Sequence, residues 1–193
     1  MLPVALFLAS LASAKPAATT APTAAPAAPP VAQDQARILN ETATADGLRQ
    51  VTIDLSGDNK PEITNFFRDR AGAEPLLMRK DVDLNRDGKV DVSTSFDDAG
   101  LRVKEDIDGD FDGRADWVDH YIDGKRSMTE IDTDFNGSFD LFKYFEGGKV
   151  RRKERDTNTD NKIDLWEYLD EQGNVTKTGR DIDGDGKMDV RDK

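Results

Sequence analysis

Five segments of the chain carry side-chain oxygens at the same four positions of a nine-residue stretch. The segments begin at residues 83, 108, 132, 156 and 181, so one copy follows another every 24 or 25 residues. Positions 1, 3, 5 and 9 are occupied by Asp83, Asn85, Asp87, Asp91, Asp108, Asp110, Asp112, Asp116, Asp132, Asp134, Asn136, Asp140, Asp156, Asn158, Asp160, Asp164, Asp181, Asp183, Asp185 and Asp189. Calcium is a hard cation that takes six to eight oxygen ligands, and a tight loop can aim alternate side chains inward. We therefore predict that these residues are the ligands of bound Ca²⁺ ions.

Position 6 of each segment holds a residue that tolerates a left-handed backbone. It is occupied by Gly88, Gly113, Gly137, Asn161 and Gly186. A loop that closes around an ion must turn sharply here, and Gly adopts a positive φ freely while Asn accepts it. The alternative is ordinary turn chemistry, because Asp, Asn and Gly are common in turns that hold no metal. Five copies in register, each with Asp at position 9, favour the metal site.

These loops resemble the calcium loops of the EF-hand superfamily, particularly the helix-poor loops of dockerin-like and thrombospondin type 3 repeats. The resemblance covers nine residues in each copy and implies calcium binding. An EF-hand loop carries a bidentate Glu at position 12, where this chain has Thr94, Asp119, Lys143, Glu167 and Asp192. Of these, Glu167 fits the role and the two Asp residues can serve, whereas Lys143 should weaken the third site. We expect the position-9 Asp to complete the coordination shell.

A degenerate copy precedes the five segments and runs from Asp54 to Glu62. It has Ser56 at position 3, Asp58 at position 5 and Asn59 in the glycine position. We do not include it among the predicted ligands. The acidic residues two places before four of the loops are candidates to assist the metal, directly or through water. They are Asp81, Asp106, Glu130 and Glu154.

The residues between the loops alternate as in β-strands. Large apolar residues stand one and five places after the position-9 Asp, with a polar residue midway, as in Trp117, Asp119 and Tyr121. Such positions share one face of a strand. Asp123-Gly124 and Gly147-Gly148 are strong two-residue hairpin signals. We predict an all-β fold, a tandem β-hairpin repeat array of meander or solenoid type, with the calcium loops along one edge and neighbouring ions roughly 10 Å apart.

The N-terminal part of the chain has the pattern of an export leader followed by a spacer. Residues 2–11 are an apolar run that ends in Ala12-Ser13-Ala14, which predicts a signal peptide over residues 1–14. Residues 15–33, almost entirely Ala, Pro and Thr, predict a disordered linker. We expect a short helix or lead-in over residues 34–47 and the repeat domain over 48–193. The hairpin at 166–175 loosely resembles the YD (RHS-type) repeats of secreted bacterial proteins, which implies a secreted, periplasmic or cell-surface location.

The charge and composition exclude several classes of function. The chain has 39 acidic and 27 basic residues, and its formal net charge of −12 would repel nucleic acids and anionic membranes. It has no Cys, and the apolar run at residues 2–11 is too short to span a membrane. The single His120, with no Ser–His–Asp, phosphate-loop or HExxH pattern, predicts that the protein is not an enzyme. A high charge combined with an apolar content of only 36% favours disorder, and a bound metal would remove much of the self-repulsion, so we expect folding to depend on metal.

Aromatic residues alternate in two of the predicted strands and are candidates for binding a protein partner. They are Phe142, Tyr144, Trp166 and Tyr168. The alternative is that twisting of the sheet covers them. Three functions stay open: a calcium-stabilised structural or adhesive module, a module that binds or inhibits one specific envelope or surface protein, and a calcium-responsive switch. Exported proteins stay saturated with calcium, which disfavours the switch.

Overall fold

Residues 36–192 are described by a computed structural model, and every regular element among them is a β-strand. The strands are β1 (Arg37–Ala43), β2 (Arg49–Asp54), β3 (Ile63–Arg70), β4 (Ala73–Val82), β5 (Val92–Phe96), β6 (Arg102–Ile107), β7 (Trp117–Ile122), β8 (Lys125–Ile131), β9 (Leu141–Glu146), β10 (Lys149–Arg155), β11 (Leu165–Leu169), β12 (Val175–Arg180) and β13 (Val190–Asp192). In this part of the chain no helix is present that could cross a membrane. The predicted signal peptide, residues 1–14, and linker, residues 15–33, lie outside the described residues.

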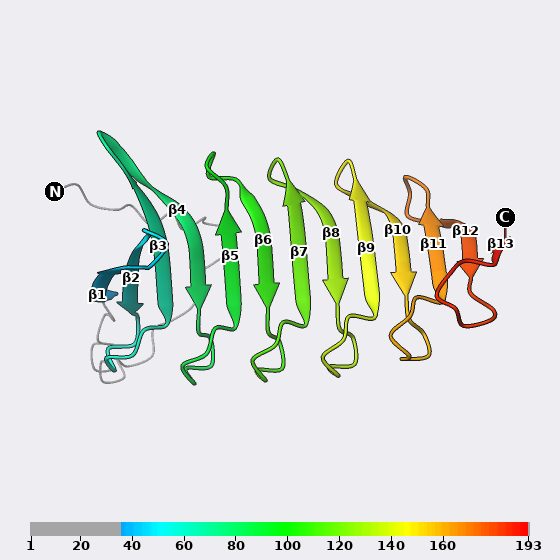
Figure 1. The fold of residues 1–193 in the computed structure, drawn as a ribbon, viewed down its shortest axis with the longest axis horizontal. Coiled ribbons are helices and arrows are strands. Elements are labelled where there is room, and N and C mark those ends of the chain that lie inside the picture. Colours follow the sequence, from blue (N-terminus) through cyan, green and yellow to red (C-terminus); the bar gives the residue numbers. More distant parts are fainter. Residues whose placement is uncertain (1–35, 193) are drawn as a thin grey trace, which may run out of the picture. The chain divides into compact units, whose positions relative to one another are not determined.

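The strands form one open antiparallel sheet, in which each strand pairs with its neighbours in sequence. The order runs from β1 to β13 without a crossover. Figure 1 shows the consequence, because the acidic loops lie along one edge of the sheet and the hairpin turns lie along the other. The structure therefore confirms the all-β tandem-hairpin meander with its acidic loops on one edge.

The hairpin turns follow from their sequences. Gly147 and Gly148, between β9 and β10, have φ of 59° and 78°, and the Asp-Gly turn between β7 and β8 has the same conformation. Two left-handed residues in succession suit the twist of the flanking strands. The longer turn between β11 and β12 is closed by a carboxylate, since Asp170 accepts the N–H groups of Gln172 (2.9 Å) and Asn174 (2.8 Å). Local sequence alone therefore accounts for this edge of the sheet.

The sheet has two faces and, among residues 36–192, no second layer. Pairing places Trp117, Ile131 and Leu141 side by side on one face, which we call the Trp117 face. Val118 and Trp166 lie on the opposite face, the Trp166 face. Buried apolar residues are few and occur on both faces: Val51, Phe66, Val118, Ile131, Leu141 and Trp166. Because a single hairpin buries little apolar surface, neighbouring hairpins must stabilise one another.

The short helix expected at residues 34–47 is wrong. Arg37–Ala43 form β1, which pairs with β2. The chain then turns at Thr44, whose N–H donates to the Leu48 carbonyl at 2.8 Å and whose hydroxyl accepts the Leu48 N–H at 3.0 Å. Pairing satisfies the outer backbone groups of β2. A helix this short would be marginal by itself and has few apolar residues to bury. Ile38, one of its two large apolar residues, is 64% exposed even in the strand.

Candidate metal sites

Each acidic loop wraps its backbone around the carboxylate at position 1. In the 83–91 loop, Asp83 accepts the N–H groups of Arg86 (2.6 Å) and Gly88 (2.8 Å), one on each oxygen. Both donors have left-handed backbones, with φ of 66° and 91°. The position-6 N–H donates to the position-1 carboxylate in every other loop as well. The hinge predicted at position 6 is therefore confirmed, and position 4 is a second hinge that the sequence analysis missed.

The position-9 carboxylate closes each loop from the other side. Asp91 Oδ2 accepts the N–H groups of Leu84 (2.5 Å) and Asn85 (3.1 Å). The position-2 N–H makes the same bond in all the other loops. Asp91 is 1% exposed, and its Oδ1 accepts no hydrogen bond. A buried carboxylate oxygen without a donor is unfavourable unless a cation meets it.

Carboxylates from distant positions converge in five of the loops. Three oxygens lie within 4.8 Å of one another in each of these groups: Asp54, Asp58 and Glu62; Asp83, Asp87 and Asp91; Asp108, Asp110 and Asp116; Asp132, Asp134 and Asp140; Asp181, Asp183 and Asp189. The residue at position 3 belongs to the group in the loops where it is Asp. In the two groups without an acidic residue at position 3, the Asp at position 5 belongs instead. Three converging carboxylates repel one another, so these groups fit a hard divalent metal ion.

Some predicted ligands have other partners. Asp112 pairs with Arg114 at position 7 of its own loop, and this hydrogen bond holds the pKa of Asp112 below its usual value. Asp185 lies 2.7 Å from Lys187 Nζ in the same way. The amide oxygens predicted as ligands accept the backbone N–H two residues further along: they belong to Asn85, Asn136 and Asn158. Positions 1 and 9 thus contribute to every group, and position 5 contributes less often than the spacing suggested.

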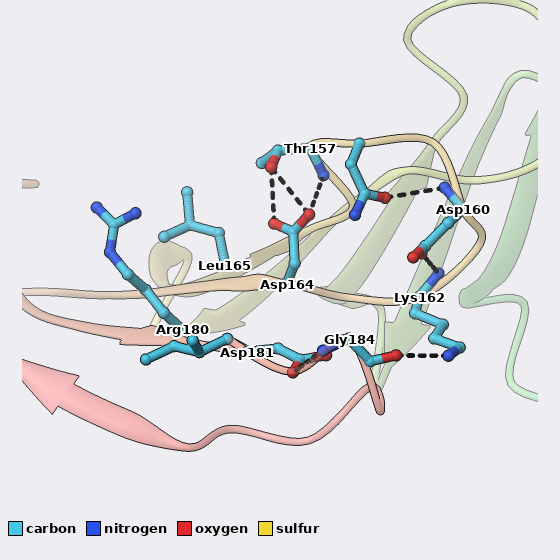
Figure 2. Close-up of a pocket in the computed structure, with 10 residues that line it drawn as sticks. Thr157, Asp160, Lys162, Asp164, Leu165, Arg180, Asp181 and Gly184 are labelled. Atoms are coloured by element: carbon cyan, nitrogen blue, oxygen red, sulfur yellow. Dashed lines mark hydrogen bonds between the residues drawn. The ribbon is translucent and has the colours of Figure 1, made fainter.

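The 156–164 loop differs because its carboxylates do not converge. Figure 2 shows the Thr157 hydroxyl donating to the Asp164 carboxylate, at 2.8 and 2.9 Å from its two oxygens. This donor occupies the carboxylate that a metal ion would need. Thr133 makes the same contact with Asp140, at 2.7 Å, in the 132–140 loop. A Thr at position 2 therefore adds a second donor to the position-9 carboxylate, and Thr in the sequence is the signal for this extra hydrogen bond. It does not by itself prevent convergence, because the carboxylates of the 132–140 loop converge.

The position-12 residues lie in the strands and not in the loops. Asp119, Thr129 and Lys143 stand next to one another in a row across the Trp117 face. Asp119 is 2% exposed, bonded to the Thr129 hydroxyl and 2.7 Å from Arg126 Nη2. Lys143 Nζ lies 5.2 Å from the centre of the Trp117 ring. The ligand role considered for Asp119 is wrong, because each extended residue carries the chain about 3.4 Å further from the loop. The weakening of the 132–140 site by Lys143 stays a prediction.

The acidic residues that precede the loops lie on the Trp166 face and have partners of their own. Glu130 Oε1 is 2.6 Å from Nε2 of His120. His120 is thus a sheet residue, in β7, with a carboxylate partner. Glu154 accepts the Tyr144 hydroxyl at 2.9 Å. Asp81 accepts the Ser93 hydroxyl, and Asp106 pairs with Lys104. None of these four carboxylates belongs to a converging group among the described residues, so they do not assist the loops directly.

Neighbouring loops contact each other through the basic residue at position 7. Lys89 Nζ donates to the Asp112 carbonyl at 3.2 Å, and Lys162 Nζ donates to the Gly184 carbonyl at 2.5 Å. Figure 2 shows the second contact, which crosses a groove of about 540 Å³ between the 156–164 and 181–189 loops. The residue at this position in the 132–140 loop is Ser138, which is too short to make such a bridge. This lateral contact was not predicted from the sequence.

The candidate partner-binding aromatics lie together on the Trp166 face. Phe142 and Trp166 flank Glu154, and Tyr144 and Tyr168 flank Arg152 in the next row. Trp166 is only 8% exposed. The Arg152 guanidinium lies 3.9 Å from the centre of the Tyr144 ring, so charged side chains separate and partly cover the aromatic ones.

Among residues 36–192, the acidic loops have a geometry suited to a cation. No model of a known protein family and no curated protein sequence matches this chain.

Proposed function

We propose that this is an exported calcium-binding repeat protein, a structural or adhesive module that is rigid when calcium is bound. The observation that carries the proposal is the buried Oδ1 of Asp91, which accepts no hydrogen bond. The Asp91 carboxylate also converges with those of Asp83 and Asp87, with one oxygen of each lying within 4.8 Å of the others. An oxygen held in this way is arranged for a cation. The same loop backbone recurs along one edge of the sheet, which favours several ions in a row.

Calcium is the ion that these loops suit best. All the converging side chains offer oxygen, and the loops close through backbone turns that can adjust to six to eight ligands. Magnesium prefers strict octahedral geometry and keeps several of its waters. Ion binding would also relieve the repulsion in a chain of net charge −12. The fold would therefore gain stability from each ion, by about 2.7 kcal/mol per site at a hundredfold excess over Kd.

The first experiment is a calcium titration of the full chain by calorimetry, with thermal unfolding in calcium and in chelator. We expect calcium to raise the melting temperature by well over 10 °C and magnesium to do much less. Asp91→Asn should remove one site, whereas the matched control Asp123→Asn, an exposed turn residue, should remove none. An unchanged spectrum and melting temperature in chelator would rule out the calcium proposal.

Export rests on residues 1–14 and has its own test. Expression in a bacterial host followed by fractionation should recover the protein outside the cytoplasm, with its N-terminus at Lys15 by mass spectrometry. If the protein stays in the cytoplasm with residues 1–14 intact, export is ruled out, whereas the calcium proposal is unaffected.

A second candidate function is binding of one specific protein through the aromatic residues of the Trp166 face. It is favoured by the grouping of Phe142, Tyr144, Trp166 and Tyr168 on β9 and β11, with no second layer of described residues over them. Capture from a cell-envelope fraction by the calcium-loaded protein, compared with Tyr168→Ala, tests it. Equal capture by both proteins would leave only the structural module.

A further inference from the structure

The degenerate loop at residues 54–62 connects β2 to β3 and keeps the backbone of the other loops. Gly57 at position 4 and Asn59 at position 6 have φ of 85° and 69°. Their N–H groups donate to the two oxygens of Asp54 at 2.6 and 3.0 Å. Asp54 is 1% exposed. The loop has therefore kept its shape although position 3 is Ser56 and position 9 is Glu62.

We propose that this loop is a sixth calcium site, in which Glu62 replaces the position-9 Asp and Arg37 of β1 competes with the metal ion. The inference rests on the proposed function, since it assigns to this loop the ion proposed for the others. Asp54, Asp58 and Glu62 each offer one oxygen, and the three oxygens lie within 4.8 Å of one another. Glu carries the same carboxylate as Asp on a side chain one methylene longer, and its N–H makes the same backbone hydrogen bond as that of Asp91.

One oxygen of Glu62 points to a ligand independently of the cluster. Glu62 is 6% exposed; its Oε2 accepts the Leu55 N–H at 2.7 Å, and its Oε1 accepts no hydrogen bond. Nε of Arg86, from the following loop, lies 3.5 Å from Oε1 on a side chain that is 57% exposed. Asp91 Oδ1 is the equivalent atom of the 83–91 loop, and it too is buried without a hydrogen bond. Both loops thus hold a buried oxygen without a hydrogen bond on a carboxylate that converges with two others, and a cation stabilises such a group.

Arg37 distinguishes this loop from the others. Its Nη2 lies 2.8 Å from Asp54 Oδ2 and 2.6 Å from Asn59 Oδ1. In the described part of the chain, no other position-1 carboxylate is in an ion pair with a basic side chain. The Arg37 side chain is 48% exposed, so it can swing into solvent. A tethered cation that must be displaced lowers the affinity of the site for calcium, by up to about fivefold for a half-exposed pair.

The test follows backbone amides by NMR during calcium titration of the full chain. The Gly57 amide reports on the 54–62 loop and the Gly88 amide on the 83–91 loop, because each donates to the position-1 carboxylate. We expect both amides to shift, with Gly57 responding at the higher calcium concentration. Arg37→Gln should lower the half-saturation concentration of the Gly57 shift by up to about fivefold and leave Gly88 unchanged.

Two further variants make the result decisive. Glu62→Gln should weaken the Gly57 response more than tenfold, whereas Glu74→Gln, on an exposed stretch of β4, should not change it. Unchanged chemical shifts of the β2 and β3 amides show that Glu62→Gln is folded. If that variant does not fold, the Arg37→Gln titration tests the proposal in its place. If calcium shifts the Gly88 amide but not the Gly57 amide, in both wild type and Arg37→Gln, the sixth site is ruled out and the proposed function stands. If neither amide shifts, the proposed function is ruled out as well. If the Gly57 half-saturation concentration is the same in Arg37→Gln and wild type, Arg37 does not compete with calcium.

Discussion

At the scale of single residues, position 2 of each loop decides how much of the position-9 carboxylate is free. Leu84 offers only its N–H to Asp91 and leaves Oδ1 unbonded. Thr157 offers its N–H and its hydroxyl, and the hydroxyl contacts both oxygens of Asp164. We therefore expect the 156–164 loop to bind calcium more weakly than the 83–91 loop.

Removing the hydroxyl should reverse part of this difference. Thr157→Val keeps the shape of the side chain, so affinity at the 156–164 loop should rise about fivefold, which corresponds to one hydrogen bond of about 1 kcal/mol. Leu84→Thr is the reciprocal change at an exposed position and should weaken the 83–91 loop by a similar factor. Site-resolved NMR titration measures both, and an increase in affinity for Leu84→Thr would contradict the explanation.

The left-handed residue at position 4 is a second residue-scale feature. Thr159 has φ of 61°, which is unfavourable for a β-branched side chain. We expect Thr159→Gly to raise the free energy of unfolding by about 1 kcal/mol, because Gly adopts this backbone without strain. The matched control is Thr176→Gly in β12, where φ is not positive and the same change should destabilise. Urea unfolding in saturating calcium separates the two, and a loss of stability at both positions would contradict the strain argument.

At the scale of elements, the turn between β11 and β12 is sensitive to acid. Hydrogen bonds from Asn174, and then from Gln172 and Gly173, hold the pKa of Asp170 below its usual value of 3.8. A carboxylate with a depressed folded pKa stabilises the fold above its unfolded pKa and loses that stabilisation as pH falls through the folded value. The melting-temperature difference between wild type and Asp170→Asn should therefore be constant above about pH 5 and shrink below about pH 4. A difference that is constant down to about pH 2 would contradict this role.

The pairing of β9 with β10 contains an unfavourable charge contact. Lys143 stands directly opposite Lys153. Burial, Lys153 and Arg155 lower the pKa of Lys143. Like charges that face each other across strands destabilise a sheet, so Lys143→Glu should add about 0.5 kcal/mol to the free energy of unfolding. Lys177→Glu makes the same charge change opposite Tyr168 and should have a smaller effect. Chemical denaturation compares the variants, and a destabilised Lys143→Glu would show that contact with the Trp117 ring matters more.

At the scale of the whole molecule, the acidic edge of the array governs the response to salt. The chain carries a net charge of −12, and its converging carboxylates lie in loops along one edge. Raising the ionic strength from about 0.01 M to 1 M shortens the screening length from about 30 Å to about 3 Å. In chelator, this change should raise the melting temperature by several degrees, whereas in saturating calcium it should have little effect. Calorimetry measures both, and an equal salt effect in the two conditions would contradict metal neutralisation.

Much of this array could be predicted from local sequence. The period-2 alternation around Trp117 and Tyr121 predicts strands, and turn signals such as Gly147-Gly148 predict hairpins. Short connections then force neighbouring strands to pair in chain order. The glycine hinge at Gly88 follows from the same logic, because the loop must turn there. The residues of the acidic loops, their edge of the sheet and the hairpin edge opposite were therefore determined by the sequence by itself.

Which of the predicted ligands meet depends on the three-dimensional arrangement of the loops. Asp112 and Asp185 pair with basic neighbours, and the carboxylates of the 156–164 loop do not converge. These pairings depend on the conformation that each loop adopts, which spacing alone does not contain. The assignment of residues 37–43 to β1, and with it the contact of Arg37 with Asp54, depends on pairing with β2. Pairing with β2 outweighs the weak local preference of these residues for a helix, because it satisfies the backbone N–H and C=O groups along the whole edge of β2 at once.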